Sequence, residues 1–257
     1  MAIISRFFGK HAEREYLRRQ IDALARENER MFAELVEIQQ DFSHLARSTW
    51  RVQEDERRHL ARELHDHLGQ TLTALVHGLE AESSQADSDH VDLARKALED
   101  TRELSRILRP PVLDDLGLEA ALQWLARRSA EVAGFETSVS VRGLSDDHRD
   151  QDMESLIFRI CQEALNNAVK HAQAGKIELS LSRIGNILEL RIRDDGVGFD
   201  PAQVAADEAR GIGLIGMQDR VRLFGGTLHL NSAPGRGTAI TVTLNLDMHA
   251  SSGNVST

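Results

Sequence analysis

A heptad repeat near the N-terminus constrains the fold of this chain more than any other feature. Apolar residues alternate there at spacings of four and three, which is typical of a seam between the helices of a coiled coil. The a and d positions are Leu17, Ile21, Leu24, Asn28, Met31, Leu35, Ile38, Phe42, Leu45, Thr49 and Val52. We predict a parallel coiled-coil dimer over residues 1–53, in which Asn28 at an a position fixes the register. A single amphipathic helix packed on its own domain is the alternative.

The repeat loses its phase just before residue 60. The next a and d positions would be Glu56, His59 and Glu63, which are polar. The apolar stripe then resumes at Leu60, Leu64, Leu68, Leu72, Leu75 and Leu79. We interpret this break as a stutter, which locally unwinds a coiled coil.

A second amphipathic helix is predicted from Asp89 to Leu108. Two antiparallel helices from each of two chains would make a four-helix bundle, so we assign residues 54–110 to a dimeric bundle domain. The segment Arg109-Pro110-Pro111 ends the second helix, because proline lacks a donor and restrains the residue before it.

The pattern beyond the two prolines is mixed. Helices are predicted over residues 116–133, 153–172 and 216–224, and strands over 137–141, 177–181, 187–193, 227–230 and 238–246. Strands and helices in separate runs favour an α+β sandwich, which we place at residues 111–250. Residues 251–257 are predicted to be a disordered tail.

Composition excludes several classes of function. The net charge of −10 and the aromatic content of 4% argue against a nucleic-acid surface. No apolar run is long enough to span a bilayer. The single cysteine, Cys161, cannot form an internal disulfide, which fits a reducing compartment. We therefore expect a cytoplasmic protein without direct nucleic-acid contacts.

His65 and Asp66 lie side by side on the first predicted helix of the bundle. An imidazole next to a carboxylate can take and return a phosphoryl group near neutral pH. That chemistry requires a phosphate donor elsewhere in the chain. Taken alone, the pair is also explained as an exposed histidine among surface charges.

One face of the helix predicted over 153–172 carries Arg159, Glu163, Asn167 and Lys170. A carboxylate, an amide oxygen and an ammonium on one face can hold Mg²⁺ and the phosphates that it bridges. A solvated polar face is the alternative.

Three glycine-rich segments follow that helix. They are Asp194-Asp195-Gly196-Val197-Gly198-Phe199, Gly211-Ile212-Gly213-Leu214-Ile215-Gly216 and Gly235-Arg236-Gly237-Thr238. The second matches G-x-G-x-x-G, but the parallel βαβ unit of a dinucleotide-binding fold is missing around it. What remains is a glycine-rich loop leading into a helix N-terminus, which favours an anion. Simple turns are the alternative reading of each segment.

Taken in order, these segments resemble the sensor histidine kinases of two-component systems. The signature Glu-Leu-His65-Asp66-x-x-x-Gln70 is similar to the nitrate-sensor subfamily, whose response regulators carry a LuxR-type helix-turn-helix output. Residues 162–171 resemble the N box of the Bergerat (GHKL) ATP-binding fold, and the glycine-rich segments resemble its later boxes. The resemblance covers residues 54–247.

The resemblance implies a role for each matching residue. His65 would be the phosphoacceptor, Asp66 would assist its proton transfer, and Gln70 would orient water when the kinase dephosphorylates its partner. Asn167 would bind Mg²⁺, with Glu163 beside it as a catalytic residue and second candidate ligand. The further ATP-binding residues implied are Lys170, His171, Asp194, Gly196, Gly198, Gly211, Gly213, Leu214 and Thr238.

The implied protein is a homodimeric protein-histidine kinase that uses ATP and Mg²⁺. It would phosphorylate itself and pass the phosphoryl group to an aspartate of a separate response regulator. Two other classes stay open. One is a coiled-coil adaptor that only binds nucleotide. The other is a Bergerat-fold ATPase driven by dimer clamping, which leaves His65 and Gln70 unexplained.

Overall fold

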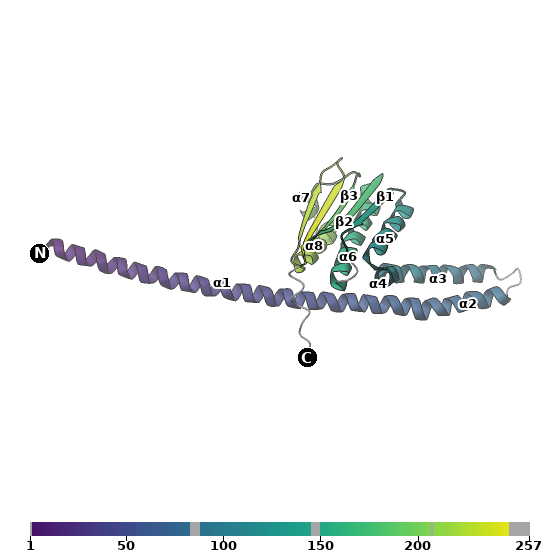
Figure 1. The fold of residues 1–257 in the computed structure, drawn as a ribbon, viewed down its shortest axis with the longest axis horizontal. Helices are drawn as coiled ribbons and strands as arrows, with labels where there is room; N and C mark the ends of the chain where they lie inside the picture. Colours follow the sequence, from purple (N-terminus) through teal and green to yellow (C-terminus); the bar gives the residue numbers. More distant parts are fainter. Residues whose placement is uncertain (1, 83–87, 145–149, 207, 247–257) are drawn as a thin grey trace. The chain divides into compact units, whose positions relative to one another are not determined.

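The computed structural model describes residues 2–82, 88–144, 150–206 and 208–246, in two compact units, Met1–Thr49 and Trp50–Thr257 (Figure 1). The predicted tail, residues 251–257, lies outside the described residues. Among the helices that the structure describes, none is both long and apolar enough to cross a bilayer.

The N-terminal helix is confirmed. Helix α1 runs from Ala2 to Glu63 without a break. Its apolar heptad residues are all more than half exposed wherever their side chains are described: Ile21, Leu24, Met31, Leu35, Ile38, Phe42, Leu45 and Val52. An uncovered apolar stripe of this kind is what one strand of a coiled coil presents in isolation.

The helix widens immediately after α1. A π-helix, η1 (Leu64–Gly69), joins α1 to helix α2 (Gln70–Glu82). The spacing of the apolar stripe explains the wide turn, because Leu60, Leu64, Leu68 and Leu72 are four residues apart and an α-helix has about 3.6 residues per turn. One wide turn keeps the stripe on one side. The predicted stutter is therefore accommodated by a π-helix that contains His65.

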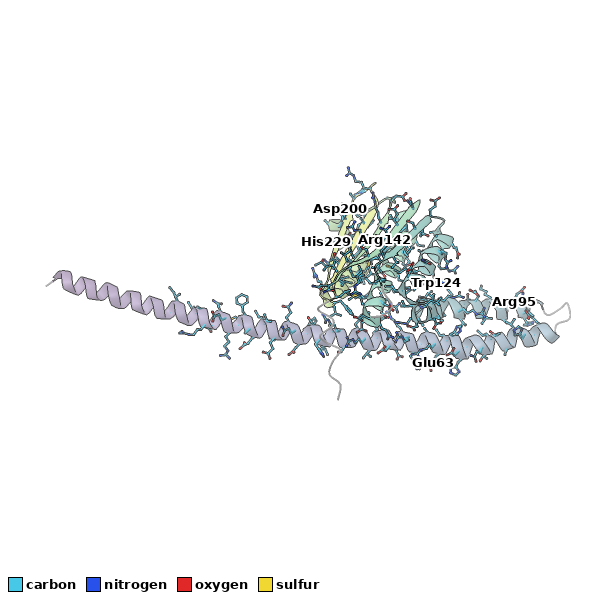
Figure 2. All side chains as sticks on the ribbon, viewed as in Figure 1. Glu63, Arg95, Trp124, Arg142, Asp200 and His229 are labelled. Carbon is cyan, nitrogen blue, oxygen red and sulfur yellow. The ribbon has the colours of Figure 1, made fainter. Side chains whose placement is uncertain are left out.

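The predicted antiparallel helix pair is also confirmed. Helix α3 (Ser88–Leu108) packs against η1 and α2. Val76, Ala94 and Leu98 form a small buried cluster between them. Figure 2 labels Arg95 of α3, whose guanidinium donates to Glu80 of α2.

The two prolines separate the helical part from the α/β part. Helix α3 ends at Leu108, and the short helix α4 (Pro111–Asp115) begins with a proline, whose fixed φ suits a first helical position. Five residues are too few for a helical periodicity to show in the sequence, so α4 was not predicted. Helix α5 (Gly117–Ala133) follows and ends at Gly134, which has a left-handed conformation.

The sheet has five strands in the order β1-β2-β3-β5-β4. The strands are β1 (Glu136–Arg142), β2 (Lys176–Ile184), β3 (Ile187–Asp194), β4 (Thr227–Ser232) and β5 (Thr238–Asn245). All five were predicted. Strands β1 and β2 are parallel and the other neighbours are antiparallel. In this register Asp194 lies between Ile177 of β2 and Thr238 of β5.

Helices α5, α6 (Gln151–Asn167) and α8 (Glu208–Leu223) pack together with the strands (Figure 1). Alternate residues of β2 and β3 are buried, so one face of the sheet meets the helices. The predicted α+β sandwich is confirmed. Helix α6 is buried on most sides, and Leu156, Ile157 and Ile160 are fully covered. Burying one such side chain stabilises the folded state by roughly 1.5–3 kcal/mol. Because α6 buries several of them, it is the central helix of the domain.

Three local predictions need correction. The helix predicted to end at residue 172 ends as a second π-helix, η3 (Ala168–Ala172). Helix α7 (Pro201–Ala206) was missed because of its length. Helix α8 begins at Glu208, so Gly211–Gly216 is helical and the predicted loop is wrong. A glycine inside a helix lowers helix stability by about 1 kcal/mol relative to alanine. Good helix formers nearby offset this cost, namely Glu208, Ala209 and Leu214.

Candidate functional site

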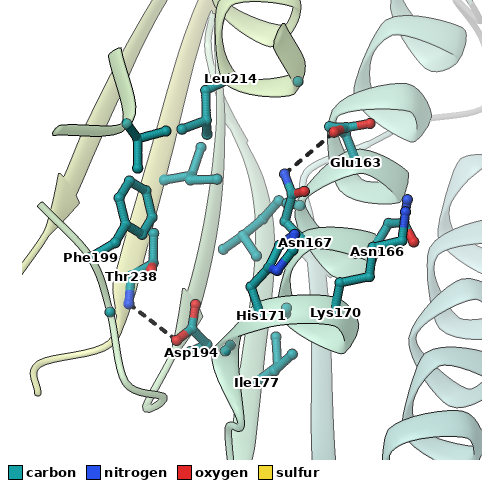
Figure 3. A pocket seen from close by; sticks show the side chains of 18 residues that line it. Glu163, Asn166, Asn167, Lys170, His171, Ile177, Asp194, Phe199, Leu214 and Thr238 are labelled. Carbon is teal, nitrogen blue, oxygen red and sulfur yellow. Dashed lines mark hydrogen bonds between the residues drawn. The ribbon is translucent and has the colours of Figure 1, made fainter. Parts of the chain in front are cut away.

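A cavity of about 670 Å³ opens among α6, η3, the ends of β2, β3 and β5, and α8 (Figure 3). Nine of the residues implied by the resemblance line it: Glu163, Asn167, Lys170, His171, Asp194, Gly198, Gly213, Leu214 and Thr238. They come from five segments spread over 76 residues of sequence, from 163 to 238, so the fold brings them together. Gly211 lies on α8, in a stretch whose side-chain surroundings are outside the description.

Asp194 is held by two backbone donors. The N–H groups of Gly196 and Thr238 donate to its Oδ1, at 2.9 and 3.2 Å. Figure 3 shows the bond from Thr238. Hydrogen bonds to a carboxylate are among the stronger ones in proteins, so the side chain has one orientation. Both bonds end on Oδ1. Among the described residues, they leave Oδ2 available to a ligand.

Ser232 supports the same wall and was missed by the sequence analysis. Its hydroxyl accepts from the N–H of Phe199 at 3.0 Å and donates to the carbonyl of Gly237 at 3.0 Å. Its Oγ also lies 3.2 Å from Oγ1 of Thr238, its partner residue across β4 and β5. One hydroxyl therefore joins three segments of the site. A serine at a strand end has no distinctive signal in a single sequence.

The second aspartate of the Asp194-Asp195 pair has a structural role. Its Oδ1 accepts from the N–H groups of Gly175 and Lys176, at 2.8 and 2.9 Å. These bonds join the end of β3 to the start of β2. The hydrogen bond from the backbone of Lys176, with a second from Gly175, lowers the pKa of Asp195.

Several glycines of the site are required by the protein's own packing. A Cβ on Gly196 would lie 2.2 Å from the carbonyl oxygen of Ala172. A Cβ on Gly198 would lie 2.2 Å from the carbonyl oxygen of Ala233, and Gly198 also has a φ of +59°. Gly196 does not line the cavity. Its predicted role toward a ligand stays a prediction, but close backbone contact already explains the absence of a side chain.

Gly213 differs from these glycines because its neighbour is a side chain. A Cβ there would lie 2.2 Å from Oε1 of Glu163. The Nδ2 group of Asn167 donates to that same oxygen at 3.4 Å, as Figure 3 shows. The glycine thus leaves room for the carboxylate that Asn167 contacts.

The end of α6 and η3 give the cavity its polar wall. Asn166 and Asn167 of α6 line it, and so do Lys170 and His171 of η3. Counted from Glu163, these residues fall at i+3, i+4, i+7 and i+8, which is one face of a helix. π-turns of this kind are frequent at functional sites.

The donor set fits Mg²⁺. Asn167 and Glu163 offer an amide and a carboxylate oxygen, and Mg²⁺ prefers hard oxygen ligands. The described residues contain no cluster of three histidine, cysteine or acidic side chains. Mg²⁺ is usually held by one or two protein groups together with phosphates and water, so a larger cluster is not required.

The opposite wall is apolar. It is formed by Ile177, Ile192, Phe199, Val204, Leu214 and Ile240. An apolar wall with a few convergent polar groups is typical of a small-molecule site, and here Asp194 is the polar group beside it.

His65, Asp66 and Gln70 lie elsewhere. All three are exposed, and none lines the cavity. Arg58 lies seven residues before His65 on the same helix, and its guanidinium contacts Asp114 and Gln151, at 3.1 and 3.2 Å. The structure therefore contains a cavity and, separately, an exposed histidine.

Two family models match the chain in agreement with this division. Residues 56–113 match the family described as "Histidine kinase", and residues 152–248 match "Histidine kinase-, DNA gyrase B-, and HSP90-like ATPase". The first match contains His65 and the second contains the whole cavity lining. The resemblance drawn from the sequence motifs is confirmed.

Similar proteins carry related names. Over 212 residues the chain is 35% identical to the sensor histidine kinase MctS of Rhizobium johnstonii, covering 77% of this chain and 46% of that protein. It is 33% identical to the oxygen sensor histidine kinase NreB of Staphylococcus carnosus, covering 77% and 58%. The chain thus spans about half the length of these relatives. Among solved structures, the histidine kinase domain of a blue-light activated kinase from Erythrobacter litoralis matches with 20% identity, 77% and 96% coverage and a TM-score of 0.47.

Proposed function

We propose that this chain, a member of the sensor histidine kinase family by the two domains it carries, binds ATP in the cavity and phosphorylates His65. The observation that carries the proposal is the cavity itself. Nine residues implied by the family resemblance line one space, although they come from five segments of the chain.

The two walls suggest how ATP is oriented. The adenine ring would contact the apolar wall, with its amino group donating to Asp194. The end of the cavity at Lys170 and His171, which offers an ammonium group and an imidazole, suits the phosphates. Asn167 and Glu163 would hold Mg²⁺, which neutralises charge on the phosphates when it is bound.

His65 would act as the nucleophile. One imidazole nitrogen forms a bond to the γ-phosphorus as the bond between that phosphorus and the β–γ bridging oxygen breaks, so that ADP leaves. The proton on the imidazole passes to a base, and Asp66 is the adjacent carboxylate. Positioning contributes most of the catalysis in phosphoryl transfer, so the two domains must bring His65 to the cavity.

The phosphoryl group would then pass to an aspartate of a response regulator. A regulator with a LuxR-type helix-turn-helix output is the partner that the Glu-Leu-His65-Asp66-x-x-x-Gln70 signature favours. Gln70 would orient water in the reverse, dephosphorylating reaction. The exposed positions of His65 and Gln70 support access by a second protein.

A second copy of the chain is the proposed partner of the helical part. Apolar side chains are exposed on α1, η1, α2 and α3 at Leu60, Leu68, Leu75 and Leu104. Together with the seam of α1, they give a dimer an extended apolar surface to bury.

Replacing His65 by Gln tests the assignment. We expect His65→Gln to abolish incorporation of radiolabelled phosphate while nucleotide binding persists. Phosphohistidine is labile in acid and stable in base, so the stability of the label distinguishes a kinase from an adaptor or a simple ATPase. Label still entering the His65→Gln protein would contradict the proposal. Steady ATP turnover without any phosphoprotein would favour the ATPase alternative.

A further inference from the structure

The roles proposed for His65 and Gln70 require both residues on the same side of their helix. In the proposed reaction the phosphoryl group passes between His65 and an aspartate of the regulator, so that aspartate docks where His65 is exposed. Gln70 can hold water against the same phosphorus only if it lies on the same face. Residues five apart lie about 140° apart around a regular α-helix, which places them on nearly opposite faces. A regular helix over this segment would therefore keep Gln70 away from the reaction.

The π-helix η1 removes that separation. It runs from Leu64 to Gly69, so the steps from His65 to Gln70 lie within the wide turn. A π-helix closes each turn with bonds between residues five apart, so the sixth residue begins a new turn close to the first. The wide turn thus places His65 and Gln70 on one face of the helix, and both are exposed.

The wide turn narrows again at Gln70. The backbone N–H of Gln70 bonds to the carbonyl oxygen of His67, only three residues back, and the regular helix α2 follows. Such a change of pitch interrupts the ladder of bonds between residues four apart, so carbonyl groups at the junction need other donors.

Two threonine hydroxyls supply donors at this junction. The Oγ1 of Thr71 donates to the carbonyl oxygen of His67 at 2.7 Å, and the Oγ1 of Thr73 donates to that of Gly69 at 2.7 Å. Both carbonyl groups belong to η1. A hydroxyl that bonds four residues back competes with the backbone ladder and bends a helix. Thr71 and Thr73 therefore stabilise the junction at which Gln70 lies.

The place of these bonds matters more than their kind. Thr101 of α3 makes the same bond to the carbonyl oxygen of Ala97 at 2.8 Å, and α3 stays a regular helix there. At η1 the four-residue spacing of the apolar stripe that begins at Leu60 already favours a wide turn. The two hydroxyls add to that preference exactly where the pitch changes.

We propose that Thr71 and Thr73 are positioning residues, which hold η1 in its wide form and so place Gln70 on the face of His65 for dephosphorylation of the regulator. This inference rests on the proposed function, because it deepens the role of Gln70. In the step itself, water attacks the phosphorus of the aspartyl phosphate as the bond to the carboxylate oxygen breaks. The aspartate leaves as a carboxylate, and both protons of the water leave with inorganic phosphate. Gln70 orients the water and exchanges no proton.

A pair of histidines can report the turn without nucleotide or regulator. Two histidines that lie one turn apart on a helical face bind Zn²⁺ together. Gln70→His creates such a pair with His65 in the wide turn but not in a regular helix, where the two positions lie about 140° apart. We expect Gln70→His to bind Zn²⁺ about tenfold or more tighter than wild type in calorimetric titrations. His65→Gln/Gln70→His is the control and should bind as weakly as wild type.

Removing the two hydroxyls should weaken this pair. Added to Gln70→His, the changes Thr71→Val/Thr73→Val should lower the Zn²⁺ affinity about fivefold, because valine keeps the branched shape but has no donor. Thr71→Ser/Thr73→Ser keeps both hydroxyls and should keep the affinity. Thr101→Val removes the same kind of bond from a regular helix and should change nothing. A Zn²⁺ affinity that does not respond to loss of the two hydroxyls overturns the proposal.

The two activities should separate in the otherwise wild-type chain. The probe is a receiver domain that has taken ³²P from the wild-type kinase. Thr71→Val/Thr73→Val should slow its dephosphorylation about fivefold, while autophosphorylation stays within about twofold of wild type because it does not use Gln70. The serine variants should restore the rate. Equal losses of both activities would point to a general folding defect and overturn the positioning role.

Shortening the turn by one residue gives an independent test. Deleting His67 leaves His65 and Gln70 four residues apart, which is about one turn of a regular helix. The apolar stripe that begins at Leu60 then has spacings of four, three and four, which a regular helix keeps on one side. We expect this shortened chain to dephosphorylate the receiver domain at about the wild-type rate, with no further change when the two valines are added. A shortened chain that still depends on the hydroxyls overturns the proposal.

The outcomes separate the wide turn from the function on which it rests. Absence of phosphoprotein from wild type refutes the proposed kinase function, and the Zn²⁺ affinities then still decide whether the hydroxyls hold the turn. Suppose instead that Gln70→Ala slows dephosphorylation and that the Zn²⁺ affinities follow the hydroxyls. Dephosphorylation that is then unaffected by Thr71→Val/Thr73→Val overturns the link between the turn and Gln70.

Discussion

The cavity and the helix that carries His65 differ in how the fold forms them. The cavity is assembled from segments spread over residues 163 to 240, and Gly198 in its lining packs against other backbone at a distance that admits no Cβ. His65 lies on a continuous helix, is exposed, and owes its setting to one wide turn. The first region is complete within one chain, whereas the second needs another domain or another protein to act. Substitutions should therefore damage the cavity through folding and the helix through partner chemistry.

The largest effect is expected at Gly198. Gly198→Ala places a Cβ 2.2 Å from the carbonyl oxygen of Ala233, in a backbone with a positive φ. Neither backbone can move without breaking the site, so we expect the free energy of unfolding to fall by about 3 kcal/mol or more. Nucleotide binding should be lost with it. Chemical denaturation of the α/β part measures the first effect.

Gly185 provides the matched control. It also has a positive φ, of +60°, but nothing lies within 4 Å of the position of its Cβ. Gly185→Ala should therefore cost only about 1 kcal/mol, the price of the backbone conformation alone. Equal losses at the two positions would show that close backbone contact is not what demands glycine at Gly198.

Gly213→Ala should separate ligand binding from stability. Its Cβ would meet Oε1 of Glu163, which is the end of a flexible side chain that can swing away. We expect thermal stability to change little. Displacing the carboxylate disturbs the contact with Asn167, so Mg²⁺-dependent ATP binding should weaken by about 1.5 kcal/mol, or about tenfold. Titration with ATP at several Mg²⁺ concentrations measures this, and unchanged affinity would argue against Glu163 and Asn167 as the metal-binding end.

Gln70→Ala tests the histidine helix with its partner present. Gln70 is exposed, so its removal should leave stability and autophosphorylation as in wild type. If it positions water, loss of phosphate from a purified phospho-regulator should slow by about tenfold. A control with regulator alone sets the spontaneous rate. Dephosphorylation that proceeds as fast with the variant as with wild type would remove this role.

The same contrast governs what the sequence could reveal. The five strands were predicted because alternation and turn residues are local signals, and Asp194 could be placed at a strand end for that reason. The positions of Arg159 and Ser232 depend on groups that meet them from distant segments, Glu54 in one case and Thr238 in the other. Arg159 was predicted on a polar face and is buried. No local pattern distinguishes a solvated arginine from one that meets a carboxylate 105 residues away.

The two π-helices, η1 and η3, differ in whether the sequence could reveal them. The run of three successive four-residue spacings from Leu60 to Leu72 contains the signal for η1, because an α-helix cannot keep such a run on one side. The segment around Lys170 has no comparable apolar run, so its spacing predicts a regular helix and η3 was missed. The face that carries Glu163, Asn167 and Lys170 could still be predicted, because those spacings suit one side of a helix.

The smallest effect is expected at Asp195, which lies next to the cavity but acts on the sheet. Its pKa is lowered by hydrogen bonds from the backbone of Lys176 and Gly175. A carboxyl with a lowered folded pKa stabilises the protein above its unfolded value of about 3.9, and that contribution is lost as the pH falls through the folded value. Asp195→Asn should therefore lower the thermal midpoint at pH 7 slightly. Below about pH 3.9 the difference from wild type should shrink. A difference that stays constant with pH would mean that the side chain acts by shape alone, and that the charge contributes nothing to joining β3 to β2.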